Sequence, residues 1–186
     1  DINASDLVDY LMSANTQLDG DATTQPLGVH QTWKTREMLG LHFNSAPEWN
    51  KTFSAYTLHT DRELLDMFGE QYPALLRLYT GYANNVQRAD VARVALMHQY
   101  GGLYADVDAF PMNLSSRLGA LPQAVIDRAY IPIGAGGVAS NHYLLADKGN
   151  PFLRYVLDSY PKLHRRWRWF VFPYLRVFFT TGPCGL

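Results

Sequence analysis

Cysteine is nearly absent from this sequence of 186 residues, because Cys184 is the only one. A single cysteine excludes a disulfide framework within the chain and a metal site built from several cysteines. Long apolar runs are missing too. No stretch of 18 or more apolar residues occurs, so no segment has the pattern of a membrane-spanning helix.

Charged residues are scarce as well. They make up 18% of the chain, the net charge is -1, and apolar residues make up 47%. This balance predicts a folded protein with a sizeable core rather than a disordered chain. It gives no electrostatic basis for binding nucleic acid, and we expect no nucleic-acid partner.

The chain begins at Asp1 rather than at a methionine, which predicts a processed or trimmed fragment and is compatible with removal of a signal or anchor. Three N-x-S/T triplets, which begin at Asn3, Asn50 and Asn113, permit glycosylation in a secretory compartment. Such triplets often arise by chance, so they are only weak support for a lumenal protein.

Strand and helix patterns alternate along the chain, which predicts an α/β fold with a sheet flanked by helices. The length fits one domain. The expected strands cover residues 28–34, 53–59, 103–107, 124–133 and 138–146, with a glycine-rich turn at 134–137. The expected helices cover residues 5–14, 88–100 and 151–160, and two more start after Thr60 and at Pro73, while residues 15–26 form a polar stem.

Several helix boundaries have local signals. Thr60 and Glu63 form a capping box, and Pro73 stands where a first helical residue is expected. Gly101 predicts a helix end. Asn150 before a proline predicts a helix start.

Two carboxylates, Asp106 and Asp108, follow a short predicted strand. In an extended segment, residues two apart point to the same side, and ligands of α/β sheets bind beyond the carboxyl ends of strands. Hard oxygen ligands suit Mg²⁺ or Mn²⁺ held against substrate phosphates. The alternative is a solvated acidic turn, because a D-x-D triplet alone is common.

The preceding helix carries Arg88, Asp90 and Arg93. Asp90 and Arg93 are three residues apart and therefore neighbours on the helix surface. The pair has the groups to hydrogen-bond sugar hydroxyls, but taken by itself it fits an ordinary surface ion pair better.

These two stretches, R-A-D-V-A-R at 88–93 and Y-G-G-L-Y-A-D-V-D at 100–108, resemble the DXD region of glycosyltransferase family 32. That family includes fungal mannosyltransferases that act on outer chains and on inositol phosphorylceramide. Further pieces resemble the family in the same order, so that the likeness covers residues 28–184: V-H-Q-T-W-K at 29–34, Y-T-L-H-T-D at 56–61, S-N at 140–141, N-P-F at 150–152 and T-G-P at 181–183. One departure is His59, which stands where the family has tryptophan.

The resemblance implies a GT-A type fold with a Rossmann-like sheet, and a retaining transfer from a nucleotide sugar, with GDP-mannose as the expected donor. It implies that Asp106 and Asp108 hold Mn²⁺ or Mg²⁺, and that Asp90, Arg93 and Asp108 are the catalytic residues. The donor site implied in this way consists of His30, Gln31, Trp33, Arg88, Asp90, Arg93, Asn141, Gly182 and Pro183. The structural alternatives are that Trp33 belongs to the core and that His30 is a buried, hydrogen-bonded histidine.

On this basis we expect residues 1–27 to form an N-terminal helix and stem, and residues 28–186 to form the catalytic domain. GT-A enzymes often supply a further metal ligand, commonly a histidine, from near the C-terminus. This chain ends at Leu186, shortly after the T-G-P stretch. A truncated site is therefore one reading of the sequence.

Basic and aromatic residues are interleaved between Lys162 and Phe179. This mixture suits a membrane interface with anionic headgroups. The alternative is that Phe172, Leu175 and Phe178 are core and the arginines form a solvated face. The resemblance in this region is to the sphingolipid mannosyltransferases of the family, which implies a glycolipid or glycan acceptor.

Two other functions stay open at the level of sequence. A glycoside hydrolase needs two carboxylates about 5–9.5 Å apart that flank the sugar bond, and a non-catalytic sugar- or lipid-binding domain would have lost turnover. For the transferase we expect the lumen of the Golgi or another secretory compartment, with membrane association through a segment outside this chain.

Overall fold

The computed structural model describes residues 27–37, 44–111, 142–169 and 172–182. The expected helix at 5–14, the stem, the strand at 124–133 and the turn at 134–137 lie outside the described residues. In the described part, no helix is long and apolar enough to cross a membrane.

Four strands of the described residues form one mixed sheet in the order β2-β1-β3-β4. The strands are β1 (Val29–Trp33), β2 (Tyr56–Thr60), β3 (Gly102–Ala105) and β4 (Tyr143–Ala146). β1 pairs in parallel with both β2 and β3, and β4 runs antiparallel to β3. The carboxyl ends of β1 and β3 therefore open at the same edge of the sheet.

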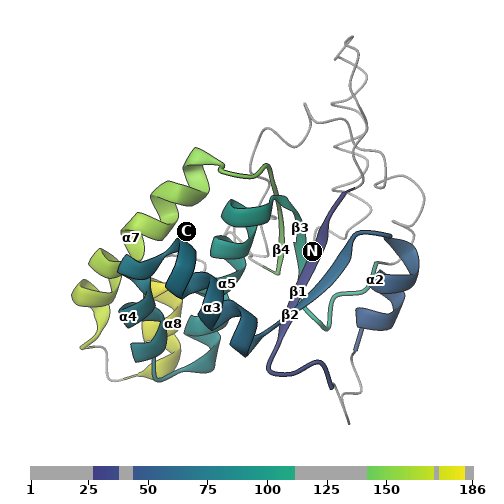
Figure 1. Ribbon diagram of the computed structural model, residues 1–186. Helices are drawn as coiled ribbons and strands as arrows, with labels where there is room; N and C mark the ends of the chain where they lie inside the picture. The colour runs from purple at the N-terminus through teal and green to yellow at the C-terminus, as the bar shows by residue number, and fades with distance from the viewer. Residues whose placement is uncertain (1–26, 38–43, 112–141, 170–171, 183–186) are drawn as a thin grey trace, which may run out of the picture.

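Helices cover the two faces of this sheet unequally (Figure 1). On one side lies α2 (Ala46–Thr52). On the other lie α3 (Asp61–Gln71), α4 (Pro73–Gly81), α5 (Asn85–Tyr100), α7 (Pro151–Trp167) and α8 (Pro173–Thr180).

The strands bury alternate residues in two cores, as their pleat requires. Tyr104, Leu144 and Ala146 join the larger core beneath α3, α4, α5 and α7. Leu103, Ala105 and Leu145 join the smaller core, together with Trp49 of α2. The alternation is typical of strands that are covered on both faces.

The helix boundaries follow their local signals. Thr60 accepts a hydrogen bond from the Glu63 backbone, and the Glu63 carboxylate accepts one from the Thr60 backbone, so the predicted capping box is confirmed. Pro73 opens α4 and Asn150 caps α7, also as predicted. The expected strands at 28–34 and 53–59 correspond to β1 and β2, and the described end of the strand expected at 138–146 is β4.

Two glycines explain the abrupt change from α5 to β3. Gly101 and Gly102 have φ angles of 71° and 90°, a region that favours glycine. A Cβ atom on Gly101 would lie 2.6 Å from the Lys148 nitrogen, and one on Gly102 would overlap the carbonyl oxygen of Gly28. Only a glycine at position 102 allows β3 to lie this close to the start of β1, and Gly101 leaves room for the backbone at Lys148.

Three sequence expectations differ from the structure. α2 and α8 were not foreseen as helices. α7 continues past residue 160, through Pro161, to Trp167. The strand expected at 103–107 ends at Ala105, because Asp106 accepts a hydrogen bond from the Ala109 nitrogen and starts a turn.

Candidate active site

A cleft of about 640 Å³ opens at the carboxyl ends of β1 and β3. This volume lies within the range of small-molecule sites, and this edge of the sheet is where α/β proteins bind ligands. Its walls come from the end of β1, the starts of α3 and α5, the end of α4, and the turn after β3. The lining residues are Thr32, Trp33, Lys34, Asp61, Leu64, Leu65, Tyr79, Thr80, Asn85, Arg88, Ala89, Arg93, Tyr104, Asp106, Val107 and Asp108.

Five of the residues that the resemblance assigns to the site lie together in this cleft: Trp33, Arg88, Arg93, Asp106 and Asp108. The indole of Trp33 is half-buried, so part of it faces the cleft. The side chain of Arg88 is hydrogen-bonded to Asn85 on the first turn of α5. Asp108 is exposed.

Asp106 and Asp108 reach the cleft by a different local geometry from the one expected. The prediction placed them on one side of an extended strand, and this is wrong because the backbone turns after Ala105. The turn sets the two carboxylates in different environments. Asp106 is largely buried, whereas Asp108 lies in the open wall of the cleft.

Arg93 is the centre of the charge arrangement. Its guanidinium lies 3.3 Å from Asp106 Oδ1 and 3.6 Å from Asp90 Oδ1. The side chain of Arg93 is only 9% exposed, so it depends on these anions for compensation. Burial lowers the pKa of Arg93, but Tyr104, Asp106 and Asp90 outweigh that effect and raise it overall.

Tyr104 is a site residue that the sequence reasoning missed. Its hydroxyl donates to Asp106 Oδ1 at 2.8 Å and lies 3.2 Å from Thr32 Oγ1, and its ring lies under Arg93 at 5.3 Å. The signal was present, because Tyr104 stands two residues before Asp106 in the Y-A-D triplet.

The ionisation of Asp106 reflects these contacts. Burial raises the pKa of Asp106, and Arg93 and the Tyr104 hydroxyl act in the opposite direction. Arg93 and Tyr104 thus help to keep an anion at a position that burial alone would disfavour.

Asp90 lies behind the cleft rather than in its wall. It is 3% exposed, and Oδ2 accepts a hydrogen bond of 2.9 Å from the hydroxyl of Thr181. Thr181 comes directly after α8, so the T-G-P stretch is brought beside the R-A-D stretch of α5. One residue further back along α8, Thr180 accepts a bond of 2.7 Å from Gln87.

Gly182 follows in the same turn. It is buried, and its nitrogen donates to the carbonyl of Val177, so it closes the end of α8 and does not line the cleft. Pro183 and Asn141, also assigned to the donor site by the resemblance, lie outside the described residues.

The buried side chain of Gln31 is hydrogen-bonded to the backbone of the DXD turn. Its side-chain nitrogen donates to the carbonyl of Asp106 at 2.9 Å and to Ser45 at 3.0 Å, and its oxygen accepts from Tyr56. Gln31 is fully buried. The structure therefore places it where it fixes the backbone of Asp106, without a surface on the cleft.

His30 lies in a separate cluster with His59 and Tyr100. His30 Nδ1 is 3.0 Å from His59 Nε2, and both rings lie near that of Tyr100. Burial, and then the neighbouring His59, lower the pKa of His30 to about 4, against a hydrogen bond with the Gly101 backbone. His59, at the position of the family's tryptophan, therefore stacks and pairs inside the fold, away from the cleft.

The carboxylates fit a divalent cation only in part. Among the described residues, no group of three or more His, Cys, Asp or Glu side chains converges on one point. Mg²⁺ and Mn²⁺ are commonly held by one or two carboxylates with phosphate and water oxygens completing the shell. Asp108, with Asp106 beside it in the cleft, matches that pattern.

Comparison with known proteins agrees with this geometry. Residues 32–124, half of the chain, match the family model described as "Glycosyltransferase sugar-binding region containing DXD motif". That region contains Trp33, Arg88, Arg93, Asp106 and Asp108.

The sequence is also similar to proteins of two fungi. The chain is 33% identical to "Inositol phosphoceramide mannosyltransferase 3" of Schizosaccharomyces pombe, over 87% of this chain and 43% of that protein. It is 29% identical to "Mannosyl phosphorylinositol ceramide synthase SUR1" of Saccharomyces cerevisiae, over 87% of this chain and 40% of that protein. The chain thus spans less than half the length of each of these relatives.

A solved structure titled "PaToxG Glycosyltransferase" resembles this one with a TM-score of 0.56, over 97% of this chain and 71% of that one, at 14% identity. At an identity this low, the likeness supports the fold alone. The structural match confirms the predicted GT-A type α/β architecture. The matched family model and the relative that is 33% identical show that the chain belongs to the family of glycosyltransferases whose sugar-binding region contains a DXD motif.

Proposed function

We propose that this chain binds GDP-mannose in the cleft and belongs to a metal-dependent, retaining mannosyltransferase that acts on an inositol phosphoceramide-like glycolipid. The observation that supports it most is the convergence of Trp33, Arg93, Asp106 and Asp108 on one cleft at the carboxyl ends of β1 and β3. The choice of mannose and of the acceptor class comes from the names of the two fungal relatives.

Each cleft residue has a role that its chemistry supports. The half-buried indole of Trp33 offers a surface on which a nucleobase stacks. Lys34 and Arg88 are cations in the cleft wall and suit phosphate oxygens. Arg93, fixed between Asp90 and Asp106, presents a rigid guanidinium to the sugar and diphosphate.

Asp108 and Asp106 would hold Mn²⁺ or Mg²⁺, which would neutralise the charge that develops on the leaving diphosphate. In the proposed transfer, the bond from the anomeric carbon to the diphosphate oxygen breaks, and the acceptor hydroxyl oxygen bonds to the same face of that carbon. The hydroxyl proton passes to the departing diphosphate.

The first experiment measures donor binding by calorimetry and thermal stabilisation, with GDP-mannose and UDP-glucose, each with and without Mn²⁺. We expect GDP-mannose to stabilise the protein, and Mn²⁺ to increase that stabilisation. Stabilisation by UDP-glucose alone would contradict the donor, and an effect unchanged by a chelator would contradict the metal.

The second experiment replaces one exposed carboxylate. Asp108→Asn should lower mannose transfer to an inositol phosphoceramide acceptor by about 100-fold or more, because a ligand of the cation is lost. It should leave the melting temperature nearly unchanged, because Asp108 is exposed.

The matched control is Asp66→Asn, which changes an exposed carboxylate on α3 outside the cleft. Full transfer activity in the Asp108 variant would refute the role of the DXD turn. Donor binding without transfer to any acceptor would instead support a non-catalytic binding domain.

A location in the Golgi or another secretory compartment stays a prediction of the family resemblance. Fractionation of cells that produce the natural protein, with digestion of any glycan at Asn3, Asn50 or Asn113, tests it. Glycan on any of the three requires passage through the secretory lumen.

A further inference from the structure

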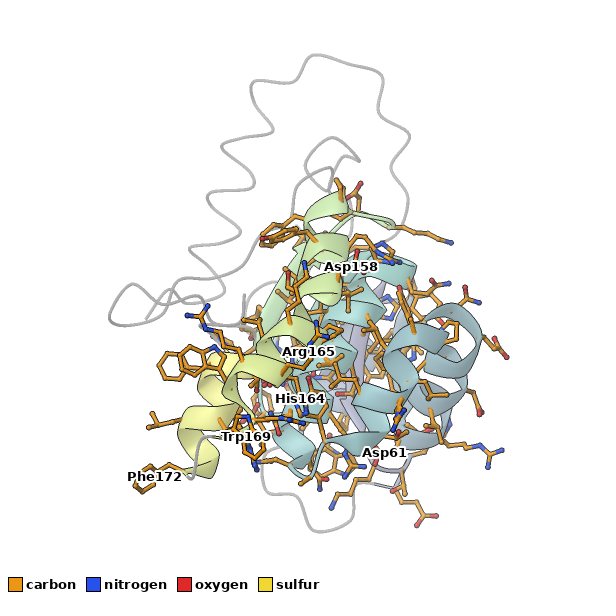
Figure 2. All side chains as sticks on the ribbon, turned by 90° about the vertical axis from the view of Figure 1, so that its left-hand side faces the viewer. Asp61, Asp158, His164, Arg165, Trp169 and Phe172 are labelled. Atoms are coloured by element: carbon orange, nitrogen blue, oxygen red, sulfur yellow. The ribbon has the colours of Figure 1, made fainter. Side chains whose placement is uncertain are left out.

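The end of α7 and the start of α8 expose large aromatic rings beside arginines. Trp169 is 76% exposed and Phe172 is 67% exposed. Figure 2 shows both residues at the same end of the molecule, with Phe172 pointing away from its body. We call the set Arg165, Arg166, Trp167, Arg168, Trp169, Phe172 and Arg176 the aromatic–arginine patch.

The rings and cations of the patch contact one another directly. The guanidinium of Arg168 lies 4.5 Å from the ring of Trp169, and that of Arg166 lies 5.3 Å from the ring of Trp167. Trp167 in turn stacks on Phe179 of α8, with ring centroids 5.0 Å apart. The two helices are thus joined beneath the patch.

The patch lies in a part of the chain with charge of one sign. No acidic residue follows Asp158, whereas Lys162, Arg165, Arg166, Arg168 and Arg176 do. Asp158 itself is paired with Arg154. In the described part of the chain, no ion pair involves any of the five later cations.

Exposed aromatic rings beside arginines favour a membrane surface over a protein partner as the ligand of the patch. A protein partner that covered the patch would have to supply several carboxylates to arginines that form no ion pair with any described residue. An anionic bilayer surface supplies negative charge over the whole area, and tryptophan and arginine are favoured at its interface. The sequence alternative placed Phe172, Leu175 and Phe178 in the core, and for Phe172 it is excluded by the exposure of that side chain.

We propose that the aromatic–arginine patch docks this domain on an anionic membrane surface. Trp169 and Phe172 enter the interface between headgroups and acyl chains, and the arginines bind lipid phosphates. No membrane-spanning helix is needed for this contact, which is peripheral and reversible.

α8 connects the patch to the candidate active site. Phe172 precedes its first residue, and Thr181, which donates to Asp90, follows its last. Eight helical residues span about 12 Å. If the proposed function holds, the docked bilayer lies close enough for the headgroup of a lipid acceptor to approach the site beside Asp90 and Arg93.

The test is flotation of the 186-residue chain with vesicles of phosphatidylcholine alone, and with vesicles that contain roughly 30% phosphatidylinositol. We expect binding to the anionic vesicles only, and a decrease as salt is raised. Binding should not depend on nucleotide sugar or Mn²⁺, so this result and that for donor binding are separable.

Two variants examine the patch itself. Each arginine near an anionic surface contributes about fivefold to partitioning, so Arg165→Ala with Arg168→Ala should weaken it about 30-fold. Arg165→Lys with Arg168→Lys keeps the charge and should restore most of the binding. Trp169→Ala should weaken it on the order of tenfold, through lost apolar burial.

The matched controls change exposed residues elsewhere. Lys51→Ala with Arg62→Ala removes two cations from α2 and α3, and Tyr155→Ala removes a ring that is 71% exposed at the other end of α7. These variants should bind like the parent, and all variants should bind donor like the parent.

Equal binding to both kinds of vesicle, no binding to either, or equal losses in the control variants would overturn the proposal. So would a self-association that Trp169→Ala abolishes while vesicle binding is absent, because the patch would then be an interface between copies of this chain.

Discussion

Replacement of Thr181 by valine should destabilise the protein and weaken the donor site together. The Thr181 hydroxyl donates to Asp90 Oδ2 at 2.9 Å, and both residues are buried. Asp90 in turn lies 3.6 Å from Arg93, which contacts Asp106 in the cleft. Valine keeps the shape of threonine and removes only the hydrogen bond.

The magnitude follows from the charge of the acceptor. A hydrogen bond to an ionised group contributes about 1.5–3 kcal/mol, and Asp90 is too buried for water to replace it freely. For a domain of this length, each kcal/mol shifts the melting temperature by about 2–4 °C. We therefore expect Thr181→Val to lower the melting temperature by about 3–12 °C.

The assay is a double-mutant cycle by thermal and urea unfolding, with Asp90→Asn as the second change. The coupling between the two positions should be about 1–3 kcal/mol. Thr181→Ser keeps the hydroxyl and should retain most of the stability. Thr80→Val is the matched control for stability, since the exposed Thr80 hydroxyl donates to backbone carbonyls of its own helix.

Two results would refute the reasoning. One is a loss of stability in Thr181→Val no larger than that in Thr80→Val. The other is an equal loss in Thr181→Ser, which would assign the effect to packing rather than to the hydroxyl. A donor affinity unchanged in Thr181→Val would separate Asp90 from the orientation of Arg93.

Two further predictions concern residues behind the cleft. The pKa of His30 is lowered from 6.5 to about 4 in the folded protein. As the pH falls below 6.5, the unfolded chain therefore binds a proton at His30 before the folded protein does. The free energy of unfolding is thus highest above pH 6.5 and decreases as the pH falls toward 4. Urea unfolding should show a loss of about 2 kcal/mol at pH 5 relative to pH 8 that is absent from His30→Gln, and equal losses in both proteins would contradict this. Gln31→Leu should cost about 2–4 kcal/mol and weaken donor binding, because three buried hydrogen bonds to Asp106, Ser45 and Tyr56 are lost. Donor binding unchanged in a folded Gln31→Leu protein would show that the DXD turn holds its position without this side chain.

Local signals predicted the elements that depend on nearby residues. The capping box of Thr60 and Glu63, the first-turn Pro73, and Asn150 before a proline all mark helix starts in the structure. Gly101 ends α5, and its positive φ gives the reason. These signals succeed because a cap or a left-handed residue acts within a few positions of the chain.

Packing overrode local signals in α7. The sequence pattern predicted an end near residue 160, and a proline inside a helix costs about 3 kcal/mol. The helix continues because its apolar stripe continues: Leu153, Val156, Leu157 and Tyr160 are buried, and Leu163 packs against the same core beyond Pro161. Burial of that stripe offsets the proline, and no sequence window reports how much surface a helix will bury.

The candidate site likewise combines features that the sequence predicted with features that only the structure revealed. The order of the motifs predicted the family, and the family model and the fungal relative confirm it. The assignment of single residues to the donor stays a prediction, although the structure brings Trp33, Arg88 and Arg93 into one cleft with the DXD turn. Tyr104, with its bonds to Asp106 and Thr32, was not foreseen, because a tyrosine in a strand reads as core.

The sequence by itself determined which groups this protein has: the D-x-D triplet at 106–108, the R-A-D stretch at 88–90, the Gly101-Gly102 pair, and the basic, aromatic stretch at 162–179. Only the tertiary structure decided how these groups are used. It placed Thr181 on Asp90, Gln31 beneath Asp106, and Trp169 and Phe172 in solvent. Contacts between residues tens of positions apart depend on how helices pack on the sheet, and that packing is set by the burial of the whole core rather than by any local pattern.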